Sequence, residues 1–163
     1  MGSRRTWAAW LLWAAATVTH SCGPTMTPAF ADAPGRRTPP AVAIGPTGAS
    51  ADLRNSDVSL DDLMREELGS LDTVRIAPRH RASFLLQGTI TRLERERRPD
   101  GVEVRCEVSV IVSDAAGGAV RMVLSGRAGA RGGNDTRALE RMAAQAAVRG
   151  ALRPLGQGLS LIR

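Results

Sequence analysis

The sequence predicts an α+β fold: a two-layer sandwich in which a mostly antiparallel sheet of about five strands carries two helices on one face. The first observation is an unbroken alternation of apolar and other residues from Val102 to Ser113, which is the period of a half-buried strand. The second is that similar runs, beginning at Phe84 and Val120, flank it across short turns. The third is a helical apolar stripe before and after these runs. Together they predict the order β-α-β-β-β-β-α.

The first half of the domain is predicted to be strand, helix, strand. Ala41–Ile44 is a short apolar run of strand character. Ser59 then has the position of an N-cap, with carboxylates in the first turn, and Gly69 is a plausible stop. Val74–Ala77 is the second predicted strand, ended by Pro78. The apolar stripe of the helix consists of Leu60, Leu63, Met64, Leu68 and Leu71.

The central feature is a predicted hairpin. The alternation that starts at Phe84 is out of phase beyond Ile90, which predicts a β-bulge near Thr91 or Arg92. Pro99-Asp100-Gly101 supplies the turn, with Gly101 free to take a positive φ. The segment 92–98 is charged on both faces, so we expect the outer end of the hairpin to project past the core.

A third meander strand and a long helix complete the domain. The strand runs from Val120 to about Ala130, and its inward residues become smaller, which indicates either fraying or the close approach of a helix. Asn134 or Asp135 is expected to cap the helix that Pro154 ends. The residues predicted to share one side of this helix are Leu139, Met142, Ala143, Ala146 and Gly150.

Another side of the last helix carries a row of arginines at i, i+4 spacing. These are Arg137, Arg141, Arg149 and Arg153, with Gln145 in the middle of the row. The row is the candidate partner-binding surface, able to dock an acidic protein, anionic lipid head groups or a nucleic acid. The alternative is an ordinary solvated helix face.

The first 31 residues read as a signal peptide. Arg4 and Arg5 precede an apolar run of the length of a secretory h-region, too short for the roughly 20 residues that span a bilayer. Ala29-Phe30-Ala31 fits the small-x-small rule, and we favour cleavage after Ala31, with lipidation of Cys22 as the alternative. The arginine pair leaves the general and twin-arginine export routes open. Residues 32–40 are expected to form a disordered tether, 41–155 a single domain and 156–163 a C-terminal tail.

Composition excludes several functions. The chain has no lysine, which rules out a phosphate-binding P-loop, and cleavage would leave 20 arginines against 16 carboxylates, a net charge of +4. Phe84 would be the one remaining aromatic residue, too few for the stacking platforms of single-strand binders, so the composition argues against nucleic acid as a partner. Cys106 shares its strand face with valines and is interpreted as a core residue, and His80 lies between two arginines without an orienting carboxylate. We expect no catalytic residue, cofactor or metal site.

Several of these stretches resemble a known fold. They are "LMREELGSLDTVRIAP", "ASFLLQGTITRLE", "VEVRCEVSVIVSDAAGGAV" and the Ala-rich last helix, with Gly88-Thr89-Ile90, Asp114 and Gly117 at matching positions. The chain resembles the envelope fold of the curli-secretion channel subunit, the amino-terminal domain of TolB and the lipoprotein activator of penicillin-binding proteins, over about 41–155. One departure is that residues 78–83 are too few for the helix that the group places there. The resemblance implies a non-enzymatic exported module that binds envelope proteins.

The sequence therefore predicts an exported protein, periplasmic or envelope-associated, with a lipid anchor at Cys22 as the alternative to a free chain. It is expected to act by protein–protein binding in an assembly or accessory role, through the exposed sheet face, the charged hairpin tip or the arginine row. Two alternatives stay open. One is a hydrolase with an unrecognised site, and the other is a basic surface that binds anionic lipid or nucleic acid.

Overall fold

The computed structural model describes residues 38–49, 58–133 and 135–162, and the fold below belongs to the unit from Arg37 to Arg163. The predicted signal peptide, its cleavage after Ala31, Cys22 and most of the predicted tether lie outside the described residues. Within them, no helix is long and apolar enough to cross a membrane.

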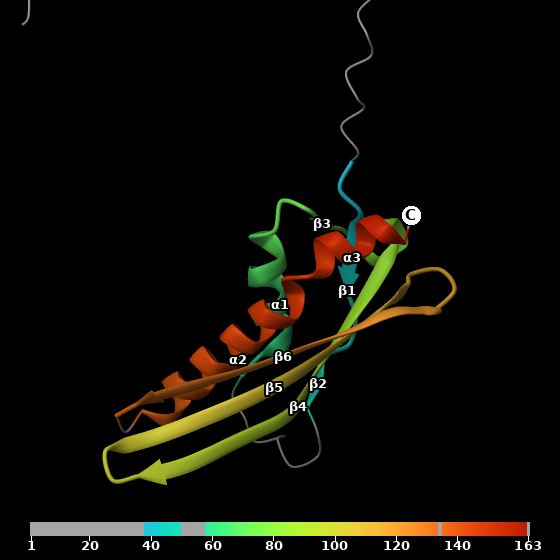
Figure 1. The fold of residues 1–163 in the computed structure, drawn as a ribbon. Coiled ribbons are helices and arrows are strands. Elements are labelled where there is room, and N and C mark those ends of the chain that lie inside the picture. Colours follow the sequence, from blue (N-terminus) through green and yellow to red (C-terminus); the bar gives the residue numbers. More distant parts are fainter. Residues whose placement is uncertain (1–37, 50–57, 134, 163) are drawn as a thin grey trace, which may run out of the picture. The chain divides into compact units, whose positions relative to one another are not determined.

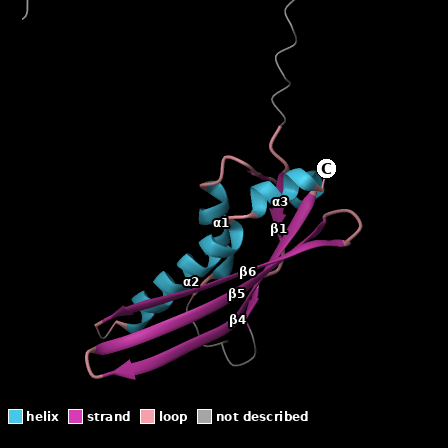
Figure 2. Ribbon diagram, in the orientation of Figure 1, coloured by secondary structure: helices cyan, strands magenta, loops and turns pink. Residues whose placement is uncertain are grey.

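The described residues form one mixed sheet with helices on one face, which confirms the predicted α+β sandwich (Figures 1 and 2). The strand order is β3-β1-β4-β5-β6, with β2 paired to β4. The three long strands are antiparallel, whereas β1 and β2 run parallel to their neighbours. The strands are β1 (Ala41–Ile44), β2 (Gly48–Ala49), β3 (Arg75–Ile76), β4 (Phe84–Arg98), β5 (Gly101–Asp114) and β6 (Val120–Gly132).

The helices are α1 (Leu60–Gly69), the 3₁₀ turn η2 (Arg79–Arg81), α2 (Thr136–Leu152) and α3 (Leu155–Leu161). The predicted caps are present: the Ser59 hydroxyl accepts from the Asp62 amide (3.3 Å), and the Asp135 carboxylate accepts from the Ala138 amide (3.1 Å). One apolar cluster joins the sheet to α1, α2 and α3. On the central strand it contains Val102, Val104, Cys106, Val108, Val110 and Val112, which confirms the alternation read from the sequence.

The β4–β5 hairpin has the predicted irregularities. The register between these strands shifts between Ile90 and Arg92, where the bulge was expected. Gly101 has φ 142°, in the region that disfavours side chains, and a Cβ there would lie 2.1 Å from the Gly132 carbonyl oxygen. Because the turn is this close to β6, its glycine serves packing as well as chain reversal.

The outer end of the hairpin does not project past the core, contrary to the sequence prediction. The first turns of α2 cover it: Arg95 Nε donates to Glu140 Oε1 on α2 at 2.5 Å, and Leu93 and Val104 are buried. The bulge accounts for the difference, because the extra residue shifts the phase of β4 and points Leu93 and Arg95 toward the helix layer.

The buried side of α2 also differs from the prediction. Met142, Ala146 and Gly150 are exposed, whereas Leu139 and Ala143 are buried as expected. The other buried members are Glu140, Ala144, Ala147, Val148, Ala151 and Leu152. The helix is rotated because its alanine-rich side fits closely against β6: a Cβ on Gly126 would lie 1.9 Å from the Ala147 carbonyl oxygen. The shrinking residues of β6 thus reflect close helix approach and not fraying.

Residues 155–161, mostly assigned to a C-terminal tail from the sequence, form the helix α3. Leu155 and Leu159 are fully buried in the main core. The chain therefore continues its packed structure beyond Pro154, and the predicted end of the domain at 155 falls at the start of a packed helix.

Candidate partner-binding surfaces

The arginine row predicted on α2 lies partly against α1. Arg149 Nε and Nη2 donate to the Glu67 carboxylate at 2.9 and 2.8 Å, and Gln145 donates to the same group at 3.3 Å. The Glu67 side chain is 7% exposed and that of Arg149 is 67% exposed, so the ion pair between α1 and α2 is half-buried. We call this contact the seam. Removing Arg149 would leave a buried carboxylate without its partner, so the middle of the row stabilises the fold.

Acid is expected to weaken this seam. The pKa of Glu67 lies below its ordinary value because Arg149 donates hydrogen bonds to its carboxylate, with burial opposing the shift. Since the folded-state pKa is depressed, the stabilisation is fully present above the ordinary pKa and is lost as the pH falls through the folded value. Urea unfolding from about pH 7 to about pH 3 should show the stability gap between wild type and Glu67→Gln closing on acidification. A gap that does not change with pH, or one matched by the exposed neighbour Glu66→Gln, would contradict this.

The remaining arginines of the row border two hollows. Arg137 and Arg141 line one of about 380 Å³, beside Ser59, Asp62 and Glu140. Arg153 lines another of about 460 Å³ beside Arg149. The polar groups of the first hollow already have structural roles, because Ser59 caps α1 and Glu140 binds Arg95. The row is thus not one continuous free surface.

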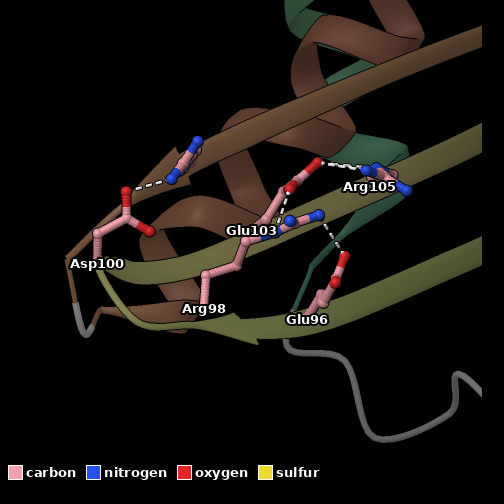
Figure 3. Close-up of polar contacts among 6 residues, drawn as sticks. Glu96, Arg98, Asp100, Glu103 and Arg105 are labelled. Carbon is pink, nitrogen blue, oxygen red and sulfur yellow. Dashed lines mark hydrogen bonds and ion pairs between the residues drawn. The ribbon is translucent and has the colours of Figure 1, made fainter.

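The tip of the hairpin carries a dense ionic cluster (Figure 3). Glu96 and Glu103 face each other across the strands, and like charges in that position repel. Arg98 offsets the repulsion: its Nη2 donates to Glu96 at 2.8 Å, and its Nε lies 3.0 Å from Glu103, an ion-pair distance without hydrogen-bond geometry. Arg105 donates to Glu103 at 2.8 Å and holds the pKa of that carboxyl below its usual value. Arg131 pairs with Asp100, so the cluster neutralises itself.

The helices leave the other face of β4, β5 and β6 uncovered (Figure 1). Toward the hairpin tip this outer face is ion-paired, as in the contact of Arg127 with Glu107 at 2.8 Å. Toward the other end it becomes apolar: Ile111 stands opposite Val123, and Val120 lies opposite Ser113. Ile111, Val120 and Val123, here called the outer apolar patch, are 37%, 60% and 62% exposed. Exposed β-branched residues on adjacent strands are a feature of interaction surfaces.

Strand β6 is also an open edge. Its neighbour in the described sheet is β5, and no described strand lies on its other side. Arg121 forms a two-point contact with Asp114 (2.8 and 2.6 Å), while Arg127 and Arg131 bind carboxylates of the same sheet. Natural edges are commonly protected by charges, bulges or proline. The arginines of this edge are engaged by carboxylates of the same hairpins, so we treat its backbone as a candidate site for another strand.

The two residues considered for chemistry are poorly placed for it. Cys106 is fully buried, which confirms its interpretation as a core residue, and burial raises the pKa of its thiol to about 11. His80 lies exposed in η2. The described residues contain no group of three or more histidine, cysteine or carboxylate side chains that could hold a metal ion.

Sequence reasoning named the exposed sheet face as a candidate surface but did not identify the residues of the outer apolar patch, although a signal was present. Ile111 is the one large aliphatic residue in the polar phase of its strand, and Val123 occupies the corresponding phase of β6. The continuous register of β5 and β6 places these two residues opposite each other, and a shift between Val112 and Ser113 brings Val120 opposite Ser113. Periodicity within a single strand could not supply that pairing.

Comparison with known proteins gives likeness in structure alone, since no family model and no curated protein matches the sequence. A variant of the PelC dodecamer from Paraburkholderia phytofirmans is 21% identical, with a TM-score of 0.53 over 72% of this chain and 90% of that one. A hypothetical protein from Chlamydia trachomatis is 13% identical, with a TM-score of 0.55 over 75% and 99%. A protein from Xanthomonas campestris is 13% identical, with a TM-score of 0.52 over 79% and 89%. At these identities the likeness establishes a shared fold.

Proposed function

We propose that this chain is an exported module of the cell envelope that acts by binding other proteins, without catalysis. The observation that carries the proposal is the open β6 edge beside the outer apolar patch. A partner strand could add to β6 through backbone hydrogen bonds, while its side chains cover Val120 and Val123. Because the arginines of β6 are already bound to carboxylates of this sheet, docking there would desolvate few unpaired charges.

Two further points support the proposal. The leader read from the sequence directs the chain to the envelope, and the resemblance to envelope-assembly proteins implies a binding role. Among proteins of similar fold, PelC is a dodecamer, so this architecture can serve in an assembly. A second copy of this chain is therefore one partner to test, beside other envelope proteins.

Charge placed on the outer apolar patch is expected to weaken partner binding. Val120→Glu/Val123→Glu should weaken association at least about tenfold, because the exposed valines would become carboxylates inside a desolvated contact. Sedimentation velocity of the purified chain measures self-association, and cross-linking in envelope extract measures other partners. Met142→Glu is the matched control, since Met142 is 60% exposed on the helix layer. If neither assay finds an association, or if both variants behave alike, the proposal fails.

A further inference from the structure

A cluster of arginines lies at the β3 edge of the sheet. Arg75 is in β3, and Arg79 and Arg81 are in η2; all three are exposed. From residue 73 to residue 93 the sequence contains no carboxylate. We call β3 and η2 together the basic edge. Along the chain the nearest carboxylate is Asp72. Arg65 of α1, which lines a hollow with Ile76 and Arg79, binds Asp61, and Asp114 opposite Phe84 is bound by Arg121.

The basic edge differs from other arginine-rich parts of the domain in having no ion pairs with the residues that the structure describes. In the described part of the chain, none of Arg75, Arg79 and Arg81 has a carboxylate partner. Elsewhere, carboxylates hold Arg65, Arg92, Arg95, Arg98, Arg105, Arg121, Arg127, Arg131 and Arg149. Three of the described arginines without a carboxylate partner thus lie within seven consecutive residues, whereas the others are spread along the domain.

The basic edge also lies beside the point where the N-terminal part of the chain enters the domain. The amide of Arg75 donates to the Pro40 carbonyl at 2.9 Å, and the amide of Ser83 donates to the Ala41 carbonyl at 2.8 Å. Both ends of the arginine segment are therefore bonded to the first residues of the fold. Any surface to which the chain before Pro40 is anchored will therefore lie close to the basic edge.

An apolar side chain accompanies the arginines at this end. Ile76, between two of them in sequence, is 38% exposed. Helix α3 lies beside Thr73 and Pro40, next to the same chain entry (Figure 1). An exposed aliphatic residue among arginines is the combination found on surfaces that rest on lipid head groups.

We infer that the basic edge is a docking surface for anionic phospholipid, which holds the domain against the membrane at the end where the tether enters. The inference rests on the proposed export to the envelope. Each arginine near an anionic surface strengthens binding about fivefold, so three would give about 100-fold. If Cys22 is acylated, the chain between it and Thr38 reaches about 50 Å when extended, which keeps the edge within range of the lipid. A chain released after Ala31 would rely on the basic edge alone.

The test is flotation of the full exported chain with vesicles of phosphatidylcholine, with and without about 30 mol% phosphatidylglycerol. The ratio of the two partition coefficients is the readout, because an acyl chain contributes equally to both, and the charges outside the basic edge are the same in wild type and in the basic-edge variant. Arg75→Gln/Arg79→Gln/Arg81→Gln should lower the ratio about 100-fold and reduce its dependence on salt. The matched variant Arg97→Gln/Arg141→Gln/Arg153→Gln removes the same charge from exposed arginines elsewhere and should retain most of the ratio.

Two results would overturn the inference: a wild-type ratio near one, or equal losses in the two variants, which would make net charge the cause. Urea unfolding of both variants checks that they are folded, as their exposed side chains predict. The Val120→Glu/Val123→Glu variant separates this inference from the proposed function. It should keep its vesicle binding, whether or not the outer apolar patch turns out to bind a partner.

Discussion

Gly126→Ala is expected to destabilise the domain by at least about 3 kcal/mol. A Cβ at this position would lie 1.9 Å from the Ala147 carbonyl oxygen and 2.6 Å from the Ala151 amide nitrogen. Both are backbone atoms of α2, so no rotamer change can make room and the whole helix must move away from β6. That movement would loosen the buried alanines through which α2 covers the sheet. The urea midpoint, followed by far-UV circular dichroism, measures the effect.

Two glycines serve as controls for this substitution. Gly129 is on the same strand, and a Cβ there would lie 3.4 Å from its nearest neighbour, so Gly129→Ala should change stability by less than about 1 kcal/mol. A Cβ on Gly88 would meet the Met64 sulfur at 2.4 Å, but a methionine side chain can adjust, so Gly88→Ala should have an intermediate cost. Equal losses at Gly126 and Gly129 would show that close helix approach does not govern this contact.

The fold was predictable because its main signals are local. Alternation within β5, the shift of phase in β4 and the two helix caps each depend on residues within a few positions of one another. The sides of the last helix were not predictable in the same way. Its small residues occur nearly all round, so apolar periodicity did not distinguish exposed Met142 and Ala146 from buried Ala144 and Ala147. Their placement depends on where β6 permits a helix backbone to approach.

The candidate surfaces were predictable only in part, because they too depend on contacts between segments that are far apart in the sequence. Spacing along α2 correctly placed Arg149 in a row with Arg141. It could not reveal that Glu67 on α1 binds Arg149 and leaves Arg141 unbound by that carboxylate. Conversely, Arg79 and Arg81 looked like an ordinary loop. Their significance comes from tertiary hydrogen bonds that bring the loop to Pro40 and Ala41. Contacts between distant segments decide which charges are neutralised.

Helix α3 was missed because its glycines look like those of a flexible tail. They instead permit packing: a Cβ on Gly156 would lie 2.4 Å from the Thr73 hydroxyl oxygen, and one on Gly158 would lie 2.8 Å from the Met122 methyl carbon. Glycine lowers helix propensity by about 1 kcal/mol, so α3 depends on tertiary contacts for its stability. Leu155 and Leu159 provide these contacts.

Leu159→Ala is therefore expected to destabilise the protein by about 2–5 kcal/mol, the usual cost of a cavity at a fully buried leucine. Leu161→Ala, on the same helix at a residue that is 86% exposed, should change stability by no more than about 0.5 kcal/mol. Urea unfolding of the two variants makes the comparison, because both remove the same atoms from the same helix. A frayed tail would give two small and equal effects, and that result would contradict the packed α3. A large effect at Leu159 alone would mean that α3 stabilises the end of the domain at which the chain enters, beside Pro40 and Thr73.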